Sequence, residues 1–369
     1  MKNILIVGAG LSGATCAAQL AQAGHAVHVI EERAHIGGNA YDEYDQHGVL
    51  IHKYGPHIFH TNSKKIFEFL SQFTQWRPYE HKVAAFVHGV HYPMPLNFSS
   101  IGRFFGVKIN NEEELRHVLD SERIPVGKIN TAEDYLLTTI GRSLMEAFFA
   151  GYSKKQWGTD LGNLDASIVA RVPLRYSFDD RYFLDVFQGI PLDGYTQMIR
   201  RMLDHPLINL SLGETASVKH FKMADVIIYT GAVDRLLGYC FGPLPYRSLR
   251  FEYEHHEVTN FFQKVGTINY PSLEDGEHTR ITEFKHLTGQ KIFGTTLVRE
   301  YSSAVGDPCY PIPSEENRSL YDKYVRNLNV HYPKLYLTGR LAEYRYYNMD
   351  QAIGSAMALI KHLADESIF

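Results

Sequence analysis

A glycine-rich segment near the N-terminus has the spacing of a pyrophosphate-binding loop. Gly8, Gly10 and Gly13 form a GxGxxG pattern, and Glu31 follows at the end of the next apolar run. In such a loop the first glycine permits a tight turn, the second lets the backbone approach a pyrophosphate, and the third lets a helix and a strand pack closely. Glu31 stands where a carboxylate accepts a hydrogen bond from an adenosine ribose hydroxyl, which disfavours a 2′-phosphate. The residue types predict a dinucleotide site and argue against NADP.

The segments around these glycines must be a strand, a helix and a second strand. Residues 3–7 form a continuous apolar run, which is typical of a strand buried on both faces of a parallel sheet. Residues 14–21 have helix-forming composition, and residues 26–30 form a second apolar run. The N-terminus of the helix would offer free N–H groups and the positive end of its dipole to phosphates. The order of these segments predicts a Rossmann-like βαβ unit.

Residues outside the glycine loop indicate which dinucleotide is bound. Arg33 and a second glycine pair follow Glu31, an arrangement that resembles FAD-containing amine-oxidase-like flavoproteins. Near the C-terminus, residues 334–340 read as a strand ending in Gly-Arg, and residues 348–362 read as a helix with several small residues. A helix N-terminus directed at the flavin pyrimidine would stabilise negative charge on the reduced ring. We predict that the cofactor is FAD.

Composition and charge exclude several classes of protein. Of 369 residues, 44% are hydrophobic and 21% are charged, as in ordinary folded chains of two or three domains. The formal charge of −4 argues against a general nucleic-acid binder. The widely spaced cysteines, without a CxxC pair, argue against a disulfide scaffold and favour the cytoplasm. No apolar run approaches the roughly 20 residues that span a bilayer, so we expect no membrane insertion.

Several longer motifs make a family resemblance specific. The chain contains KYGPHIFHTN at 53–62, GYSKKQWG at 151–158, RVPLRYSFDDRYF at 171–183, HTRITE at 278–283 and GRLAEYRY at 339–346. These motifs resemble those of the UDP-galactopyranose mutase family, and the resemblance extends from the first strand to the last helix. Members interconvert the pyranose and furanose forms of a nucleotide sugar without net oxidation. The resemblance therefore implies an isomerase that acts on a nucleotide-diphosphate sugar.

The resemblance also implies a mixed α/β fold in three parts. We expect an interrupted Rossmann-like FAD-binding domain, formed by residues 1–76, 191–238 and 328–369. An inserted helical domain would span residues 97–175, with a mobile loop at 158–171. An antiparallel sheet domain would consist of residues 77–96, 176–190 and 239–327. The sequence pattern agrees, since it predicts helices at 112–119, 132–138 and 143–152, strands within 81–90 and 250–299, and a further Rossmann strand at 224–231.

The resemblance implies a catalytic role for the reduced flavin. N5 of reduced FAD would attack the anomeric carbon and expel the nucleoside diphosphate. An external reductant such as NAD(P)H is then required, and the chain has no second GxGxxG pattern for it. His57 would lie over the flavin and sense its redox state. His57 and His60 are three residues apart, but no third ligand is signalled nearby, so we predict no metal site.

Side chains around the departing diphosphate should be cations and phenols. Arg171 and Arg280 match the two diphosphate-binding arginines of the family, and planar guanidinium groups pair well with phosphate oxygens. The loop at 158–171 would carry Arg171 onto the diphosphate and exclude water. We predict Arg171, Arg280 and His57 as catalytic residues. The remaining predicted substrate-binding residues are His81, Phe148, Phe149, Tyr152, Trp157, Tyr182, Asn269, Tyr310 and Tyr346. The predicted cofactor-binding residues are Gly8, Gly10, Ser12, Gly13, Glu31, Glu32, Arg33, Gly38, Asn39, His57, Ile58, Val218, Gly339, Arg340, Tyr347, Asn348 and Met349.

Two positions depart from the family's usual pattern. His81 stands where an asparagine is usual, and Asn348 where an aspartate is usual. An amide in place of a carboxylate removes charge but keeps a similar shape, which would alter hydrogen bonding to the sugar more than folding. UDP-galactose is the first expectation for the substrate. UDP-N-acetylgalactosamine and a dTDP-6-deoxyhexose such as dTDP-fucose are the alternatives.

Two other classes of function also contain the N-terminal cofactor motif. A flavin amine oxidase would need an apolar or amine-binding pocket, whereas Arg171 and Arg280 favour an anionic ligand. A flavin-binding regulator without turnover would have no reason to retain pocket residues in three separate segments. The family resemblance further leads us to expect a homodimer, with a nucleotide sugar but no nucleic acid as partner.

Overall fold

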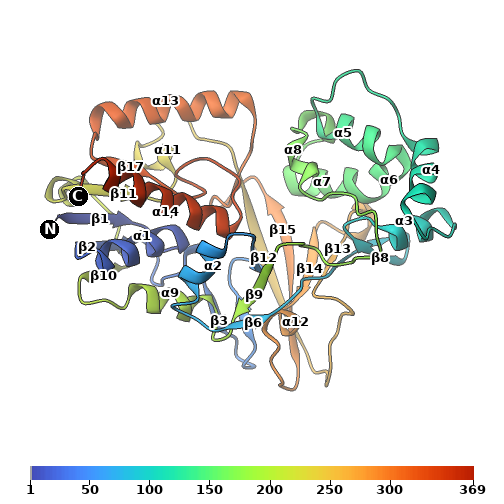
Figure 1. Ribbon diagram of the computed structural model, residues 1–369, viewed down its shortest axis with the longest axis horizontal. Coiled ribbons are helices and arrows are strands. Elements are labelled where there is room, and N and C mark those ends of the chain that lie inside the picture. Colours follow the sequence, from blue (N-terminus) through green and yellow to red (C-terminus); the bar gives the residue numbers. More distant parts are fainter. Residues whose placement is uncertain (1) are drawn as a thin grey trace.

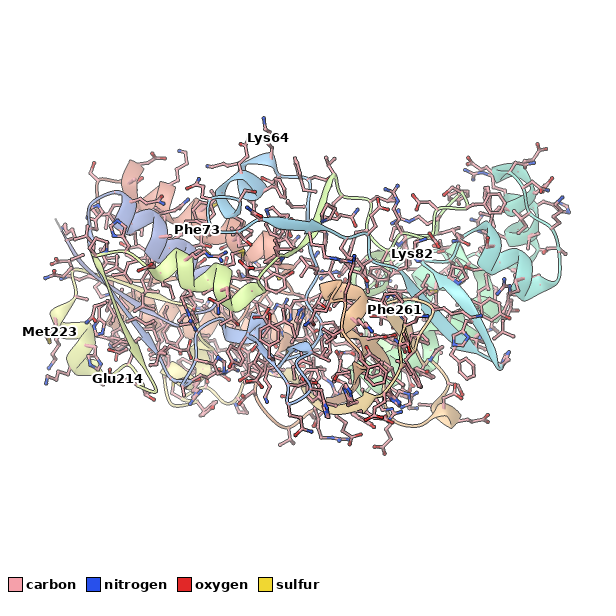
Figure 2. The ribbon with its side chains drawn as sticks, turned by 90° about the horizontal axis from the view of Figure 1, so that it is seen from below. Lys64, Phe73, Lys82, Glu214, Met223 and Phe261 are labelled. Carbon is pink, nitrogen blue, oxygen red and sulfur yellow. The ribbon has the colours of Figure 1, made fainter. Side chains whose placement is uncertain are left out.

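The computed structural model describes residues 2–369, except for the side chain of Val218. Both chain ends lie at one end of the molecule, in a part built on a parallel sheet (Figure 1). The helices of residues 98–170 form the opposite end, and the largest sheet lies between the two. Side chains fill the interior between these parts, while Lys64 and Met223 project from the surface (Figure 2).

The parallel sheet confirms the predicted Rossmann-like unit. Its five strands run in the order β10-β2-β1-β11-β17, and every adjacent pair is parallel. Ile4 and Ile6 of the central strand pack into one buried cluster and Leu5 into another, so this strand is buried on both faces. The strand bounds are β1 Asn3–Val7, β2 Ala26–Glu31, β10 Ile208–Leu212, β11 Val226–Tyr229 and β17 Leu335–Leu337.

Helices cover both faces of this sheet. α1 packs against α14 and α9 over one face, in the cluster that contains Ile4 and Ile6. On the other face, side chains of α10 join the cluster around Leu5, and α11 packs against α13 nearby. The helices of this part are α1 Leu11–Gln22, α2 Lys64–Leu70, α9 Tyr195–Leu203, α10 Val218–Met223, α11 Val233–Leu236, α13 Glu315–His331 and α14 Met349–Asp365.

The largest sheet has seven strands in the order β16-β12-β15-β14-β13-β7-β8. It is antiparallel as predicted, with one exception, because β13 and β7 run parallel, with Thr267 opposite Val83. These strands come from distant parts of the chain with no hairpin between them, so no tight turn imposes an antiparallel pairing. The bounds are β7 Val83–Val87, β8 Val90–Met94, β12 Tyr246–His256, β13 Thr267–Asn269, β14 Arg280–Glu283, β15 Thr295–Ser303 and β16 Tyr310–Pro311, with α12 at Phe284–Thr288.

The helical part packs around a leucine-rich core that includes Leu115, Leu119, Leu136 and Leu144. The predicted helix at 143–152 is a continuous run of α6, a π-helical turn and α7. The bounds are α3 Phe98–Phe105, α4 Glu112–Glu122, α5 Ala132–Thr139, α6 Gly141–Met145, the π turn Glu146–Ala150, α7 Gly151–Trp157, a 3-10 turn Leu161–Asn163 and α8 Ser167–Ala170.

Two small sheets connect the parts. β5, β9 and β6 form a three-stranded sheet in which β9 is central, and β3 pairs with β4. Their bounds are β3 Asp42–Tyr44, β4 Leu50–His52, β5 Phe59–Thr61, β6 Trp76–Pro78 and β9 Phe187–Pro191, and 3-10 turns cover Gly38–Ala40 and Leu273–Asp275. Among residues 2–369, no helix combines the length and the apolar composition needed to cross a bilayer.

Candidate active site

The glycines of the first turn have little space for side chains. Gly8 has φ of +108°, and a Cβ atom there would lie 2.1 Å from Oγ1 of Thr230. A Cβ atom on Gly13 would lie 1.9 Å from the carbonyl oxygen of Gly8. A Cβ atom on Gly10 would be in ordinary contact, 3.6 Å from Cα of Gly38. Gly8 therefore permits the tight turn and Gly13 the close packing of helix and strand, as expected. Gly10 faces Gly38 of the second glycine pair.

Glu31 holds the glycine turn against the segment that follows β2. Its side chain is buried, and its two carboxylate oxygens accept from the backbone N–H groups of Ala9 at 2.8 Å and Arg33 at 2.9 Å. Each oxygen keeps a lone pair for a ribose hydroxyl. Arg33 donates to Oδ1 of Asn39 at 3.1 Å and stacks its guanidinium over the ring of Tyr54 at 4.3 Å. These contacts build a polar cradle beside the glycines.

The turns after β1, β11 and β17 meet at the carboxyl ends of the parallel strands. Oγ of Ser12 donates to the carbonyl oxygen of Ala352 at 3.3 Å, which ties α1 to α14. A Cβ atom on Gly339 would lie 2.8 Å from the same hydroxyl. This edge of an α/β sheet is where ligands bind. The residues present therefore fit a dinucleotide, whose phosphates the α1 N-terminus would hold when it is bound.

One predicted cofactor residue does not join this cradle. Glu32 forms an ion pair with Arg235 at 2.9 Å and is substantially exposed, so its carboxylate is directed to the surface. The side chain of Val218 lies outside the described residues.

A cavity of about 1240 Å³ lies where the three parts meet. Its volume exceeds the range of roughly 300–1,000 Å³ usual for one small ligand. The structure brings all the predicted catalytic and substrate-binding residues together on its wall, with part of the cofactor set. Those lining residues are His57, Ile58, His81, Phe148, Phe149, Tyr152, Trp157, Arg171, Tyr182, Asn269, Arg280, Tyr310, Arg340, Tyr346, Tyr347, Asn348 and Met349.

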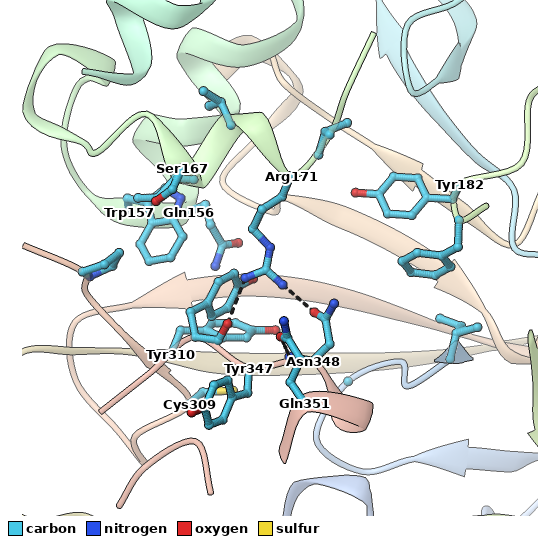
Figure 3. A pocket seen from close by; sticks show the side chains of 18 of the residues that line it. Gln156, Trp157, Ser167, Arg171, Tyr182, Cys309, Tyr310, Tyr347, Asn348 and Gln351 are labelled. Carbon is cyan, nitrogen blue, oxygen red and sulfur yellow. Dashed lines mark hydrogen bonds between the residues drawn. The ribbon is translucent and has the colours of Figure 1, made fainter. Parts of the chain in front are cut away.

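Arg171 reaches across the cavity from the end of α8 (Figure 3). Its Nη1 donates to the carbonyl oxygen of Tyr346 at 3.0 Å, and its Nη2 donates to Oδ1 of Asn348. The guanidinium carbon lies 4.1 Å from the centroid of the Tyr346 ring. The segment 158–171, predicted as a loop without sustained periodicity, contains a 3-10 turn and α8. Arg171 therefore joins the helical part to the start of α14.

Asn348 has two tasks at this junction. It caps α14 in a reciprocal pair with Gln351, whose Oε1 accepts from the Asn348 N–H at 2.9 Å. Its side-chain oxygen also accepts from Arg171. Because an amide is neutral, this contact positions the guanidinium without cancelling its charge.

Replacing Asn348 by alanine should therefore lower both stability and activity. Loss of the cap should cost about 1 kcal/mol of unfolding free energy, and release of Arg171 should lower kcat/KM for the nucleotide sugar by about 10-fold. Asn111→Ala is a matched control, since Asn111 caps α4 by accepting from the Glu114 N–H at 3.0 Å and lies outside the cavity. Denaturant unfolding and initial rates measure the two effects. Equal kcat/KM in the two variants would contradict the role of Asn348.

Arg280 is paired with a buried carboxylate. It lies on β14 directly opposite Glu300 of β15, whose Oε1 accepts from Nη2 of Arg280 at 2.8 Å. Glu300 is only 1% exposed. Burial acts against the charged guanidinium, but the Glu300 carboxylate holds the pKa of Arg280 well above its usual value. Arg280 therefore stays charged inside the protein.

Neutral phenols surround the two arginines. Burial raises the pKa values of Tyr152, Tyr182 and Tyr310, so these phenols stay protonated as hydrogen-bond donors. Tyr310 and Tyr346 meet edge to face at 5.1 Å, and Trp157 meets Tyr346 at 5.9 Å. The labelled side chains of Figure 3 show Tyr310 below Arg171, with Trp157 and Tyr182 on its two sides. An anion held here would meet two guanidinium groups, one of them paired with Glu300, and several neutral donors.

The aromatic residues with which the helical part lines the cavity lie on the π turn and α7. Phe148 is 4% exposed and packs edge to face on Tyr92 at 5.3 Å, so it belongs to the core as well as to the cavity wall. Phe148 and Phe149 lie within the π turn, and Tyr152 follows it in α7. Such turns occur often at functional sites, where they redirect side chains. Here Phe148, Phe149 and Tyr152 all line the cavity.

Three histidines near this site stay neutral; His52 and His81 are buried, and His57 is half-buried. Burial is the main cause that lowers the pKa of His52, His57 and His81 to about 3 in each case. The His57 ring hydrogen-bonds through Nδ1 to the carbonyl oxygen of Gly55 at 2.7 Å. The backbone N–H of His57 donates to Nδ1 of His52 at 2.9 Å. His81 hydrogen-bonds through Nδ1 to the Tyr79 hydroxyl at 3.0 Å. A neutral ring suits a hydrogen-bonding role for His57 better than a role as a general acid.

These histidines should make the protein less stable in acid. An unfolded chain protonates them as the pH falls below 6.5, whereas the folded chain keeps them neutral down to about 3. Each should therefore remove about 2 kcal/mol of unfolding free energy between pH 7 and pH 5. His81→Asn, which cannot titrate, should lose about 2 kcal/mol less than wild type over that interval. Denaturant unfolding at both pH values measures this, and an unchanged pH dependence would contradict it.

Several residues on the cavity wall are not among the site residues predicted from the sequence. His60, Asp185, Glu300 and Cys309 all line the wall. His60 lies inside the KYGPHIFHTN motif, so that motif was a usable signal. Glu300 carries no such signal, because only strand pairing places it opposite Arg280. Among the described residues, no group of three or more His, Cys, Asp or Glu side chains could hold a metal ion.

Comparisons with known proteins agree with this geometry. The family model described as UDP-galactopyranose mutase matches residues 147–346. The chain belongs to the UDP-galactopyranose mutase family. A second model, described as an NAD(P)-binding Rossmann-like domain, matches residues 6–73.

Relatives match this mutase over nearly its whole length. A probable UDP-galactopyranose mutase of Klebsiella pneumoniae is 38% identical and covers 96% of this chain and 93% of its own. A dTDP-fucopyranose mutase of Escherichia coli is 34% identical and covers 97% of both. A crystal structure of reduced UDP-galactopyranose mutase superposes with a TM-score of 0.81 at 16% identity, covering 99% of this chain and 96% of the other, which shows a shared fold. Family membership confirms the predictions of an isomerase and of FAD as the cofactor.

Proposed function

We propose that this mutase interconverts the pyranose and furanose forms of a nucleotide-diphosphate sugar, with UDP-galactose as the first candidate. The observation that carries the proposal is the convergence of Arg171 and Arg280 with tyrosine hydroxyls in one cavity beside the dinucleotide cradle. A diphosphate leaving group carries about two negative charges, and two guanidinium groups can hold them through paired hydrogen bonds. Reduced FAD supplies the electron pair for attack on the anomeric carbon when it is bound.

The two arginines would contact the diphosphate in different ways. Arg280 is fixed in the sheet by Glu300, so it marks one place for the diphosphate. Arg171 comes from a short helix and now rests on Tyr346 and Asn348, contacts that a substrate oxygen could replace. In this division Arg280 receives the diphosphate and Arg171 closes over it, which excludes water from the reacting carbon.

The nucleobase belongs on the helical side of the cavity. The reaction needs little proton transfer by side chains. Phe149, Tyr152 and Trp157 offer ring faces for a base on the helical side. His57 and His81 are neutral there and add no charge that would compete for the diphosphate. We propose His57 as a contact to the flavin, where it can exchange hydrogen-bond partners as the ring changes its redox state.

The choice of hexose has two alternatives. The 34% identical relative named as a dTDP-fucopyranose mutase supports dTDP-fucose, and His81 and Asn348 depart from the usual pattern near the sugar. UDP-N-acetylgalactosamine is the other alternative. Incubating dithionite-reduced protein with each of the three nucleotide sugars, followed by liquid chromatography, measures furanose formation. We expect turnover by reduced protein and none by oxidised protein. Reduction of the flavin by a substrate would instead support an oxidase.

Further expectations accompany this function. We propose the division into FAD-binding, helical and sheet domains at the limits given above, although β5 of the FAD-binding domain pairs with residues 187–189 of β9, which lie in the sheet domain. We propose a homodimer, which light scattering tests, and transient reduction by NAD(P)H without a dedicated site. A cytoplasmic location is in keeping with the free cysteines Cys16, Cys240 and Cys309.

A further inference from the structure

A histidine and an aspartate on the cavity wall have no role in the mechanism above. His60 on β5 hydrogen-bonds through Nδ1 to Oδ2 of Asp185 at 2.9 Å. Their side chains are 12% and 22% exposed, and both line the cavity. A carboxylate bonded to one ring nitrogen fixes the tautomer and the orientation of an imidazole.

Asp185 is itself held in place. Its Oδ1 accepts from Nδ2 of Asn62 at 2.8 Å, so both carboxylate oxygens have partners. The side chain of Gln188 donates to the carbonyl oxygen of Asp185 at 2.9 Å, and Gln188 lies opposite His60 in the β5–β9 pair. The aspartate is therefore anchored beside β5, which carries the histidine, and beside β9, which pairs with β5.

The plane of the His60 ring is also determined. The ring stacks on Phe183 with a centroid distance of 3.6 Å and an interplanar angle of 13°. Phe183 in turn neighbours Tyr182 at 5.0 Å and His81 at 6.3 Å. In the tautomer that donates the Nδ1 proton to Asp185, Nε2 carries a lone pair, and no described residue hydrogen-bonds to this Nε2.

The chemistry of this pair selects the part of the substrate that it can meet. A diphosphate has only acceptor oxygens and negative charge, so it is unsuited to a ring nitrogen lone pair backed by a carboxylate. The nucleobase side has the aromatic residues of α7. A hexose offers hydroxyl donors, and its apolar C–H face suits a nearby aromatic ring. The ribose also has hydroxyl donors, but it is attached to the base that we place beside α7. The hexose is therefore the part that we assign to His60.

We propose that Asp185 is a positioning residue that orients His60, so that Nε2 of His60 accepts a hydrogen bond from a hydroxyl group of the hexose. This inference rests on the proposed function and names the residues that recognise the sugar. The inference predicts different effects on two ligands. His60 would contribute to binding of the nucleotide sugar and nothing to binding of the nucleoside diphosphate alone.

The test compares those two ligands on the FAD-loaded, reduced protein. Dissociation constants for UDP-galactose and UDP, and for dTDP-fucose and dTDP, are measured in wild type, Asp185→Asn, Asp185→Ala and His60→Phe. We expect binding of the preferred nucleotide sugar, and its kcat/KM, to weaken about 10-fold in Asp185→Ala and in His60→Phe. Asp185→Asn should recover part of the loss, because its amide oxygen can still accept from Nδ1. Binding of the diphosphate alone should change less than about 2-fold.

A nearby aspartate provides the control. Asp180 pairs with Lys82 at 2.9 Å on the same connecting segment and does not line the cavity, so Asp180→Asn should leave all constants unchanged. Equal weakening of both ligands in the Asp185 variants would show that Asp185 only supports the pocket, and would overturn the inference. Unchanged binding of the nucleotide sugar would also overturn it. If Asp185→Ala fails to hold FAD, the isosteric Asp185→Asn decides. Absence of furanose product from wild type would refute the proposed function separately, since the binding ratios do not depend on turnover.

Discussion

Replacing Arg280 by lysine should remove most of the mutase activity while leaving the protein folded and yellow. Lysine keeps a positive charge beside the buried Glu300, so no isolated carboxylate is left in the interior. It cannot reproduce the paired planar donors of the guanidinium, which should hold the diphosphate most strongly as it leaves. We expect kcat/KM to fall by about 100- to 1,000-fold, the usual cost of losing a donor aimed at developing charge.

The control for this prediction is another arginine of the same sheet. Arg250 on β12 is exposed and pairs with Glu252 outside the cavity, so Arg250→Lys should keep wild-type kinetics. The measurements are initial rates with the preferred nucleotide sugar and the flavin absorbance of each purified variant. Wild-type turnover in Arg280→Lys would refute the assignment of the diphosphate to this side chain.

Gly13→Ala should give a protein that does not retain FAD. The added Cβ would lie 1.9 Å from the carbonyl oxygen of Gly8 and 3.4 Å from Cγ2 of Ile6, so α1 would have to move away from β1. That movement opens the turn that cradles the pyrophosphate and disturbs the core of the parallel sheet. We expect a loss of at least about 3 kcal/mol of unfolding free energy and a colourless protein.

A glycine in open space gives the matched comparison. A Cβ atom on Gly127 would have no heavy atom within 4 Å, so Gly127→Ala should bind FAD as wild type does. Flavin absorbance after gel filtration and denaturant unfolding of each variant measure the two outcomes. Retention of FAD by Gly13→Ala at full occupancy would show that the turn tolerates a side chain, and the assignment of the cofactor to this turn would fail.

The features that sequence reasoning predicted correctly depend on residues close together in the chain. The strands at 3–7 and 26–30 and the glycine turn between them follow from apolar runs and from the small volume of Gly8 and Gly13. Helix starts are equally local, since a cap such as Asn348 acts on N–H groups within its first turn. The motifs that carry the family resemblance are continuous segments as well, and they contain Arg171 and Arg280.

Contacts between distant segments could not be predicted in this way. The pairing of Arg280 with Glu300 needs the register of β14 on β15, and the parallel pairing of β13 with β7 depends on how two separate segments meet. The π turn, which contains Phe148 and Phe149, has no clear signature in the residues that form it.

The sequence by itself determined that this chain builds a dinucleotide cradle, carries two arginines in family motifs and belongs to a flavin-dependent mutase family. Only the tertiary structure decided that Arg171 rests on Tyr346 and Asn348, that Glu300 pairs with Arg280, and that Asp185 lies within hydrogen-bond distance of His60. The physical reason is the range of each interaction. Turns, caps and apolar runs act over a few residues, whereas charges and hydrogen bonds in the cavity join side chains that only packing of the whole chain brings within 3 Å.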